Sequence, residues 1–512
     1  MTEHMILLKP TNVQVRATAG TSLRDLLFEQ GVEFPCGGQG RCRGCKVRVL
    51  RGEATITDAQ RAHLNESELL QGWRLACQCT LDDDLEIELR QWDAAILGNE
   101  SAFVFTPREG LGVAVDLGTT TVVAQLLNLN TSQVLAVRSA LNAQARFGAD
   151  VMSRVSHAVE AQGQAELTRL IREQIGKLIR DLVFAGQVDA VLIREVVIVG
   201  NTVMHHLFCG IDLEPMSRTP FEPIDDGLKT FEAQELGWRL GDGATICFLP
   251  CLGGFVGSDI LAGVMATQLH ESAELVGLVD LGTNGEMVIG TRDGLLCAST
   301  AAGPAFEGAR ISMGMRAASG AISEVQLDRD QIGHVVCRVL GSVLPTGICG
   351  SGLVDAVACG LGLSVIGASG RLNMHAKGVS KNSEARWLLH DPIVITQTDI
   401  RQLQLAKGAI AAGIRILLNE LGARDEDLTE LYLAGAFGNY INRVSAHRIG
   451  LLPVSPERTQ SVGNAALLGA KMALFAGTDA ALYDAIRCKT RHVSLNEAPG
   501  FMDIYVEEMG FP

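Results

Sequence analysis

Two stretches of this 512-residue chain share one pattern and decide the fold. They read G-V-A-V-D-L-G-T-T-T-V-V-A-Q-L-L from Gly112 to Leu127 and V-G-L-V-D-L-G-T-N-G-E-M-V-I-G from Val276 to Gly290. Each is an apolar run that reaches Asp-Leu-Gly-Thr and returns as a second apolar run, which predicts a strand, a tight turn and a second strand. The recurrence of one hairpin in altered form indicates two similar lobes that face a shared cleft.

The turns of these hairpins carry groups suited to a nucleotide. Asp116 and Asp280 each follow a buried strand, where a carboxylate can hold a hydrated Mg²⁺. The next residues offer N–H and hydroxyl donors to phosphate oxygens; they are Gly118, Thr119, Thr120 and Thr121 in the first turn and Gly282, Thr283, Asn284 and Gly285 in the second. One such hairpin is compatible with an ordinary glycine turn, but the pair predicts nucleotide binding.

The expected catalytic residues are carboxylates of the same hairpins. We assign Asp116, Asp280 and Glu286 to this role. Glu286 and Glu307 lie in glycine-rich loops, where a carboxylate can orient the attacking water or bind Mg²⁺ or ribose. The alternative for these two glutamates is an ordinary position on the surface.

The paired hairpins resemble the phosphate-1 and phosphate-2 loops of the ATPase superfamily of sugar kinases, Hsp70 and actin. L-Y-L-A-G-A-F-G-N-Y-I, from Leu431, is similar to the adenosine-binding motif of that superfamily and contains Gly435 and Gly438. G-N-A-A-L-L-G-A-K-M-A-L, from Gly463, reads as a small-residue helix that lets two lobes pack closely at their hinge; a plain alanine-rich packing helix is the alternative. The resemblance implies a two-lobed α/β fold of the RNase H-like type.

A separate signal lies near the N-terminus, where five cysteines occur in the first 80 residues. Cys36, Cys42 and Cys45 lie in F-P-C-G-G-Q-G-R-C-R-G-C-K, and R-L-A-C-Q-C-T adds Cys77 and Cys79. Three thiolates from one loop and a fourth from a distant segment suit a [2Fe–2S] cluster. The C-x5-C-x2-C spacing is one residue longer than the plant-type run, and the glycines between these cysteines allow N–H groups to turn toward sulfur.

This loop resembles that of adrenodoxin-like and related [2Fe–2S] ferredoxins, in which R-L-A-C-Q matches the last ligand. The resemblance implies four cluster ligands: Cys36, Cys42, Cys45 and Cys77. Cys79 is then a neighbouring thiol or a fallback ligand. Zinc is the competing metal, because four cysteines also make a structural tetrahedral site. A disulfide framework is the third alternative, but 13 scattered cysteines without a secretory signal favour a reduced cytoplasm.

Composition limits the class of function. The chain has a formal net charge of −15, 47% hydrophobic residues, 56 glycines and 5% aromatic residues. An acidic chain without a basic stripe does not favour nucleic acid, since binding to phosphate backbones relies on clustered Lys and Arg. No apolar stretch reaches the length of a membrane span, so we expect a soluble, cytoplasmic protein. The glycine content suits an α/β protein with many tight turns.

The chain is long enough for about three domains. We expect a β-grasp ferredoxin domain over residues 1–93 and a linker over 94–110, with a short strand at 103–105. The first lobe is expected over 111–205 and a larger second lobe over 206–512. Within the first domain, apolar patterning predicts one helix and four strands; the helix covers 22–30 and the strands 5–8, 13–17, 46–50 and 85–89.

A ferredoxin domain followed by this ATPase fold resembles the reductive activators of corrinoid proteins, which return Co(II) corrinoid to Co(I) for methyl transfer. Four further segments carry the resemblance: N-A-Q-A-R-F-G-A-D-V-M-S-R from Asn142, V-G-N-T-V-M-H-H from Val199, A-A-G-P-A-F-E-G-A from Ala301 and G-I-C-G-S-G-L from Gly347. It implies a [2Fe–2S] cluster, ATP and Mg²⁺ as cofactors. It also implies a corrinoid protein and an external low-potential reductant as partners, and it is compatible with a homodimer.

Three other functions remain open on the sequence. Activators of radical dehydratases join this ATPase fold to an iron–sulfur centre, but they hold a [4Fe–4S] cluster within the lobes and lack a fused ferredoxin. A metabolite kinase of the same superfamily transfers phosphate to a small acid or sugar. A redox-gated binding protein changes its affinity for a client with the state of the cluster.

Three residues of these segments have both a functional and a structural interpretation. His205 and His206 are adjacent, so they point to different sides of a helix or strand, which favours packing or capping over a metal pair. Cys349 is compatible with a redox thiol or ligand, or with a small buried hydrophobe.

Overall fold

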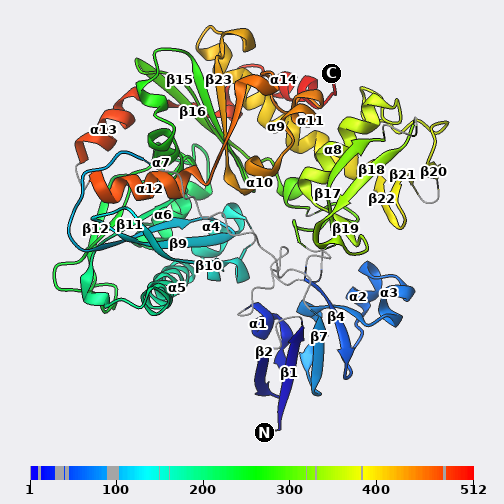
Figure 1. Ribbon diagram of the computed structural model, residues 1–512, viewed down its shortest axis with the longest axis horizontal. Helices are drawn as coiled ribbons and strands as arrows, with labels where there is room; N and C mark the ends of the chain where they lie inside the picture. The colour runs from blue at the N-terminus through cyan, green and yellow to red at the C-terminus, as the bar shows by residue number, and fades with distance from the viewer. Residues whose placement is uncertain are drawn as a thin grey trace.

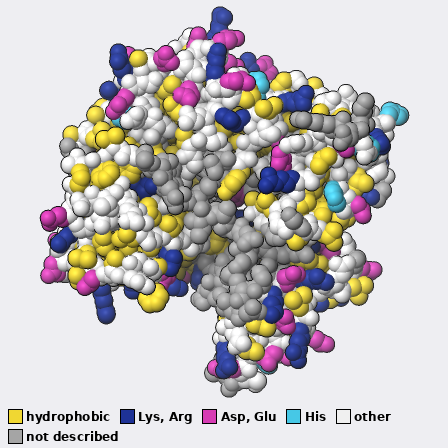
Figure 2. All heavy atoms as spheres, in the orientation of Figure 1, with side chains coloured by type: hydrophobic (Ala, Val, Ile, Leu, Met, Phe, Trp, Pro, Cys, Tyr) yellow, Lys and Arg dark blue, Asp and Glu magenta, His cyan; other side chains and the backbone are white. Residues whose placement is uncertain are grey.

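The computed structural model describes residues 2–9, 13–28, 40, 45–88, 103–148, 150–160, 162–308, 310–318, 320–328, 331, 333–381, 384–476 and 480–512. A small N-terminal domain lies beside two larger lobes, and a β-rich extension projects from the second lobe (Figure 1). None of the described helices is long and apolar enough to cross a membrane. On the face drawn in Figure 2, Lys and Arg side chains are interspersed with Asp and Glu side chains.

The N-terminal domain is a β-grasp fold built on a mixed sheet. Its strand order is β2 (Val13–Thr18), β1 (Glu3–Lys9), β7 (Leu85–Glu88), β4 (Lys46–Arg51) and β5 (Trp73–Leu75). β1 and β7 are parallel and the other neighbours are antiparallel. The remaining elements are α1 (Leu23–Phe28), α2 (Asp58–His63), α3 (Glu66–Leu70), η1 (Ala76–Gln78) and the short pair β3 (Thr21–Ser22) and β6 (Thr80–Leu81). The four strands and the helix lie close to their expected positions, although Ser22 belongs to β3 and not to the helix. Residues 29–30 of the expected helix and residue 89 of the expected last strand lie outside the described residues.

The first lobe is built on a six-stranded sheet with helices on both faces. The strand order is β10 (Val134–Leu141), β9 (Thr121–Asn128), β8 (Leu111–Leu117), β11 (Ile193–Gly200), β13 (Thr245–Phe248) and β12 (Lys229–Glu232). β8, β11 and β13 are parallel. The buried side chains of one face pack against α4 (Val151–Ala158), α5 (Gly163–Gly186) and α6 (Thr202–Cys209).

The expected boundary between residues 205 and 206 does not separate the lobes. It falls inside α6, and β12 and β13 beyond it belong to the sheet of the first lobe. β13 pairs with β11, which places the buried side chains of Ile246 and Phe248 in the first-lobe core. The first lobe therefore continues past β13.

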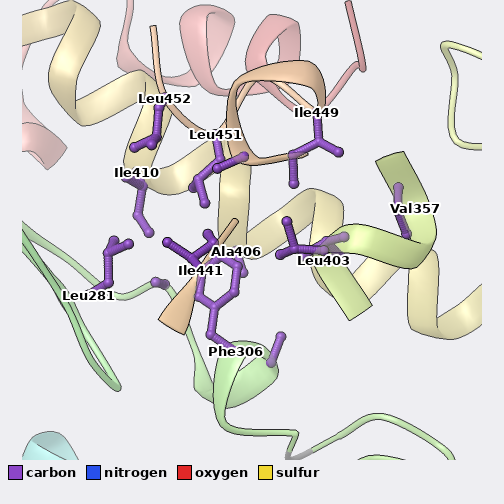
Figure 3. Close-up of a cluster of buried hydrophobic side chains, with 14 of the residues drawn as sticks. Leu281, Phe306, Val357, Leu403, Ala406, Ile410, Ile441, Ile449, Leu451 and Leu452 are labelled. Carbon is purple, nitrogen blue, oxygen red and sulfur yellow. The ribbon is translucent and has the colours of Figure 1, made fainter. Parts of the chain in front are cut away.

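The second lobe repeats this plan with a second six-stranded sheet. The strand order is β24 (Thr459–Gly463), β23 (Glu430–Ala434), β14 (Val276–Leu281), β15 (Gly285–Thr291), β16 (Gly294–Thr300) and β25 (Thr490–His492), the last preceded by α13 (Ala480–Lys489). Its main core includes side chains from α8 (Gly350–Gly362), α9 (Gln397–Glu420), α11 (Arg443–Arg448) and α14 (Phe501–Glu508). In Figure 3, Phe306 points toward Ala406 and Ile441 in the middle of this core.

Helices α7 (Ser258–Ala266) and α12 (Ala465–Ala476) lie between the two large sheets. Their buried side chains share one core with strands of both lobes. Small residues permit this approach, because a Cβ at Gly469 would lie 2.1 Å from the backbone oxygen of Ala262. The small-residue helix expected from Gly463 therefore packs the two lobes together.

Residues 103–108 enter the first lobe without forming the short strand expected at 103–105. The ring centroids of Phe103 and Phe105 lie 5.4 Å and 4.8 Å from that of Phe475 in α12. A helix surface offers side-chain contacts but no free backbone groups for a ladder. The two phenylalanines therefore anchor the segment through their rings.

The extension of the second lobe contains two three-stranded sheets. They are β18 (Val335–Val339), β17 (Ala321–Leu327) and β19 (Gly347–Ile348), and β20 (Val379–Lys381), β21 (Ala385–His390) and β22 (Ile393–Thr396). A Cβ at Gly350 would lie 1.8 Å from the carbonyl oxygen of Phe306, and one at Gly352 would lie 2.2 Å from that of Ile322. The glycines of G-I-C-G-S-G-L thus allow α8 to pack closely against η6 (Pro304–Glu307) and β17.

Candidate functional site

The two predicted phosphate loops meet between the lobes. The first joins β8 to β9 and the second joins β14 to β15. The Oγ1 atoms of Thr120 and Thr283, 163 positions apart in the sequence, lie 3.4 Å from each other. The structure thus brings together the turns of the two repeated hairpins.

Both loops have the tight backbone that their glycines predict. The N–H of Gly118 donates to the carbonyl of Thr121 at 3.1 Å, and a Cβ at Gly118 would lie 2.7 Å from that oxygen. In the second loop, the N–H of Gly282 donates to the carbonyl of Asn284 at 3.0 Å. Gly285 begins β15, and a Cβ at this position would lie 2.9 Å from the side chain of Ile410 in α9.

Polar side chains from two other segments support the first loop. Asn201 donates from Nδ2 to the Thr119 hydroxyl at 2.8 Å, and Asn142 donates from Nδ2 to the Gly118 carbonyl at 2.9 Å. Arg154, which is fully buried, donates to the Thr119 carbonyl. The segments that begin at Asn142 and Val199 therefore hold the backbone of the first phosphate loop.

Four carboxylates gather beside the loops: Asp116, Asp259, Asp280 and Glu286. The aspartates are half-buried and the glutamate is buried. Burial raises the pKa of Asp116 to about 6, although a hydrogen bond from Asn464 Nδ2 at 2.8 Å lowers it. Burial, followed by the charge of Asp116, raises the pKa of Asp280 to about 7. Crowded, poorly solvated carboxylates hold protons until a cation compensates their charge.

Asp259 was not among the residues predicted from the sequence. It lies in the first turn of α7, and burial followed by the charges of the two loop aspartates raises its pKa. The position is fixed by its neighbours: the N–H of Gly200 donates to the Ser258 hydroxyl at 3.1 Å, and a Cβ at Gly257 would lie 2.2 Å from the Gly200 carbonyl oxygen. The only local signal is G-S-D at the start of an apolar helix, which predicts a helix N-terminus but no functional site.

Glu286 and Glu307 both belong to this region. Glu286 is 8% exposed, and burial together with the charges of Asp259 and Asp280 raises its pKa well above the usual range. Glu307 accepts a hydrogen bond from the Thr283 hydroxyl at 2.7 Å. The alternative of an ordinary surface position is therefore wrong for Glu286, while Glu307 supports the second loop.

The carboxylate cluster fits a hydrated cation. Within the described part of the chain, no three His, Cys, Asp or Glu side chains are arranged to hold a metal ion directly. Mg²⁺ usually keeps several waters and binds one or two carboxylates together with substrate phosphates. Burial raises the pKa of both Asp116 and Asp280, and the charge of Asp116 adds to the effect on Asp280. A hydrated Mg²⁺ at this position would stabilise the ionised form of both carboxylates.

The two glycines of the adenosine-type motif differ in their surroundings. Gly435, the first residue of α10 (Gly435–Tyr440), has φ +83°, and a Cβ there would lie 2.4 Å from Asp280 Oδ1 and 2.8 Å from the carbonyl oxygen of Leu281. At Gly438 a Cβ would make only ordinary contacts with Leu433, at 3.5 Å. The motif therefore lies directly against the second phosphate loop, and Gly435 is the residue that permits this approach.

In the N-terminal domain, the segments of two predicted cluster ligands lie side by side. Cys45 precedes β4 and Cys77 lies in η1, and the N–H of Ala76 donates to the carbonyl of Cys45 at 3.0 Å. Gly40, from the cysteine loop, has φ +69°, and a Cβ there would lie 2.8 Å from Gln78 Nε2. Part of the cysteine loop thus lies against the segment that carries Cys77.

The structure distinguishes Cys77 from Cys79. Cys79 is 3% exposed, its thiol donates to the carbonyl of Leu75 at 3.4 Å, and burial raises its pKa to about 11. The Cys79 sulfur is therefore engaged with the backbone of its own segment. Cys77 is only half-buried, which favours it as the fourth ligand. Cys36 and Cys42 lie outside the described residues.

The adjacent histidines and Cys349 occupy structural positions. His205 and His206 are fully buried in α6; His205 Nε2 lies 3.0 Å from the carbonyl oxygen of Gly227, and His206 Nδ1 lies 2.9 Å from that of Thr202. Burial lowers both pKa values, that of His205 to about 3. Cys349 is 2% exposed at the start of α8. The packing interpretation is confirmed for the histidines, and the cysteine is buried as a small hydrophobe would be.

Known families account for the three parts of the chain. Residues 6–82 match the 2Fe-2S iron-sulfur cluster binding domain. Residues 111–272 match the RACo middle region, and residues 274–512 match the C-terminal domain of RACo, the ASKHA domain. The division near residue 273 agrees with the sheet of the first lobe, which includes β12 and β13.

Two relatives and one solved structure cover most of the chain. The corrinoid activation enzyme RamQ of Eubacterium limosum is 35% identical over 415 residues, which cover 77% of this chain and 69% of that protein. The Co(II) methylated amine-specific corrinoid protein reductase of Methanosarcina barkeri is 26% identical over 430 residues, 78% of this chain and 77% of the relative. A solved reductive activator for corrinoid, iron-sulfur protein has a TM-score of 0.70 at 29% identity and covers 99% of this chain and 98% of its own. The chain therefore belongs to the RACo family of corrinoid activation proteins, in which a [2Fe–2S] ferredoxin domain precedes an ASKHA-type ATPase fold.

Proposed function

We propose that this protein transfers one electron from a [2Fe–2S] cluster to the Co(II) of a corrinoid protein, with ATP hydrolysis, and so regenerates Co(I) for methyl transfer. The observation that carries the proposal is the combination in one chain of two sites. Paired phosphate loops meet beside four carboxylates, and a ferredoxin domain holds the Cys45 and Cys77 segments side by side. Membership of the corrinoid activator family supports the choice of electron acceptor.

The energetics explain why an electron carrier needs ATP. A plant-type [2Fe–2S] centre has a potential near about −400 mV, and Co(II) in a free corrinoid is harder to reduce, so the transfer runs uphill. Each 100 mV costs about 2.3 kcal/mol for one electron. Coupling free energies between ligand sites are typically about 1–3 kcal/mol, comparable with roughly 40–130 mV. Nucleotide-driven closure of the lobes is therefore of the right size to favour reduction of a bound partner.

The residues of the two sites have distinct roles in this proposal. Asp116 and Asp280 would hold a hydrated Mg²⁺, which would neutralise the nucleotide phosphates, while Asp259 and Glu286 would orient the attacking water. The loop threonines and glycines donate to phosphate oxygens, and Gly435 admits the adenosine motif to the second loop. The thiolates that hold the cluster, which supplies one-electron transfer when bound, are Cys36, Cys42, Cys45 and Cys77.

An anaerobic cobalt spectrum tests the proposal. Candidate Co(II) corrinoid proteins are mixed with the reduced protein and a low-potential reductant, with Mg-ATP, with Mg-ADP and without nucleotide. We expect the Co(I) band with Mg-ATP alone. The absence of Co(I) with every candidate, despite a reducible cluster and ATP hydrolysis, would contradict the proposal and favour another electron acceptor or a redox-gated binding protein. A stoichiometric phosphorylated small molecule would indicate a kinase.

Three finer features belong to the same proposal. An external low-potential reductant returns the cluster to its reduced state. This is tested by replacing the chemical reductant with a physiological electron donor and measuring reduction of the cluster. A cytoplasmic location would keep the cluster cysteines reduced, and cell fractionation tests it. A homodimer is expected by likeness to the family, and light scattering on the holoprotein would distinguish it from a monomer.

A further inference from the structure

Within the part of the chain that the structure describes, the ferredoxin domain touches the first lobe where α1 meets η2 (Ala143–Arg146). Arg24 of α1 donates from Nη2 to the carbonyl of Arg146 at 3.0 Å. Ala145, the preceding residue, packs against the buried core of the ferredoxin domain. Both residues of the lobe belong to η2. α1 lies at the end of the N-terminal domain nearest the first lobe in Figure 1.

On the ferredoxin side, the contact is close to the cluster. α1 packs against η1, the short helix that contains Cys77. The N–H of Ala76 in η1 donates to the carbonyl of Cys45. A change in the position of α1 therefore acts on the segment that carries a proposed cluster ligand.

On the other side, η2 belongs to a rigid polar turn, residues 142–148, which we call the bridging turn. Asn142 and Gln144 are fully buried, and Asn142 caps η2 by accepting from the Gln144 N–H at 3.0 Å. Gln144 donates to the carbonyl of Leu167 in α5 at 3.0 Å, and the ring of Phe147 stacks on His157 with centroids 4.6 Å apart. Buried polar groups with satisfied hydrogen bonds hold one geometry, because breaking any of them is costly.

The bridging turn and α4 hold three successive carbonyls of the first phosphate loop. Asn142 donates to Gly118 from its side chain at 2.9 Å and to Thr120 from its backbone N–H at 2.8 Å. Arg154 donates to Thr119 and, from Nε, to the carbonyl of Gly148 at 3.0 Å. Because a peptide is planar with its N–H and C=O on opposite sides, these bonds turn the N–H groups of the loop away from the bridging turn. A phosphate that binds those N–H groups acts on the same peptide units.

From this chain of contacts we propose that α1 and η2 form a nucleotide-responsive docking surface, through which the ATP site and the position of the ferredoxin domain influence each other. This inference rests on the proposed ATP-dependent function and names how its two sites communicate. A nucleotide that fixes the position of the first phosphate loop also fixes, through these hydrogen bonds, the position of the rigid bridging turn relative to that loop, so α1 docks at a lower entropic cost. Two short elements are enough for docking because both domains belong to one chain, which keeps their effective concentration high.

Hydrogen exchange on the anaerobic, cluster-loaded, full-length protein tests the coupling. The measured segment is α1, with and without the Mg²⁺ complex of a non-hydrolysable ATP analogue. We compare wild type with Arg24→Ala, with Arg24→Lys, which keeps a donor, and with Arg61→Ala as a matched control. Arg61 is an exposed arginine on α2 of the same domain. Cluster absorption checks that every variant is loaded.

We expect the analogue to slow exchange in α1 of wild type and Arg61→Ala, to have no effect in Arg24→Ala, and to have a partial effect in Arg24→Lys. Because coupling is reciprocal, Arg24→Ala should also weaken analogue binding by about 5-fold relative to Arg61→Ala, at the lower end of typical couplings. Analogue binding to wild type without a change in α1 would overturn the inference, as would an equal response in Arg24→Ala. Co(I) formation distinguishes this inference from the proposed function. If α1 responds to the analogue but no Co(I) forms, the coupling is upheld and the proposed function is contradicted. If Co(I) forms but α1 does not respond, the proposed function is upheld and the coupling is contradicted.

Discussion

The two phosphate hairpins share the sequence Asp-Leu-Gly-Thr, but the rest of the molecule holds them differently. The first is held by polar side chains: Asn142, Arg154 and Asn201 all bond to its turn. In the second, the Thr283 hydroxyl donates to Glu307, and the backbone of Gly435 packs directly against Asp280 and Leu281. One repeated local pattern therefore produces a loop held by several buried polar side chains and a loop that depends more on close backbone packing.

The same contrast extends to the carboxylates. Burial raises the pKa of Asp116 to about 6, although the hydrogen bond from Asn464 lowers it. For Asp280, burial and then the charge of Asp116 raise the pKa to about 7, without a compensating donor among the described residues. The first loop is thus suited to communicate with other segments. Asp280 in the second loop carries a charge that is less well compensated than that of Asp116. Four experiments can test this difference between the loops.

Replacing either loop aspartate should have the largest effect. Asp116→Asn and Asp280→Asn remove a charge that compensates Mg²⁺, and we expect ATP hydrolysis to fall by about 10²–10³-fold, the usual loss for one preorganised electrostatic group. Cluster absorption should be unchanged, because Cys45 and Cys77 belong to a separate domain. ATPase assays and visible spectra on the same preparations check both parts. Retention of ATP-dependent Co(I) formation in both variants would contradict the assignment.

Gly435→Ala tests whether the second loop depends on close backbone packing. The left-handed backbone costs a non-glycine residue about 1–2 kcal/mol, and displacement of Asp280 and Leu281 adds about 1–3 kcal/mol, so we expect roughly 2–5 kcal/mol lower stability. Gly438→Ala is the matched control in the same short helix, where a Cβ makes ordinary contacts and the change should stay within about 1 kcal/mol. Thermal unfolding measures both. Equal changes in melting temperature in the two variants would show that the close approach at Gly435 does not contribute to stability.

The repeated hairpins could be predicted because each is one continuous pattern of apolar strand, turn and strand. Asp259 could not, because it reaches the site through the placement of α7 between the sheets, which no local pattern encodes. The boundary at residue 205 was wrong for a similar reason: β13 joins the first sheet by a non-local parallel pairing with β11. The contact of Arg24 with Arg146 joins two domains through a single backbone carbonyl, which leaves no mark in the sequence.

The pH dependence of the free energy of unfolding tests the crowding of the Asp116 and Asp280 carboxylates. Between about pH 5 and 8 the unfolded chain has lost the protons of Asp116 and Asp280, while the folded protein without nucleotide still holds part of them. The folded state therefore binds more protons, and its stability falls as pH rises through the folded pKa values of about 6 and 7. We expect a loss of about 1–3 kcal/mol relative to the double variant Asp116→Asn/Asp280→Asn. Melting temperatures of both proteins at pH 5, 6.5 and 8 give the comparison, and parallel curves would contradict it.

Asn464 should produce the smallest effect, and it distinguishes the two aspartates. Its amide donates to Asp116, while its Oδ1 accepts from the Leu467 N–H at 2.7 Å at the start of α12. Asn464→Ser keeps an acceptor for the helix and removes the amide donor. Because that hydrogen bond lowers the pKa of Asp116, its loss should raise this pKa further.

The sign of the effect on cation binding follows from this shift. At pH 6 more of Asp116 is protonated in Asn464→Ser than in wild type, so affinity for Mg-nucleotide should fall by a few-fold, as expected from a hydrogen bond of about 1 kcal/mol. At pH 8 Asp116 is ionised in both proteins and the affinities should converge. Titration calorimetry at the two pH values measures this. An equal loss at both would mean that Asn464 acts on helix α12 and the lobe interface, leaving Asp116 and Asp280 distinguished by burial alone.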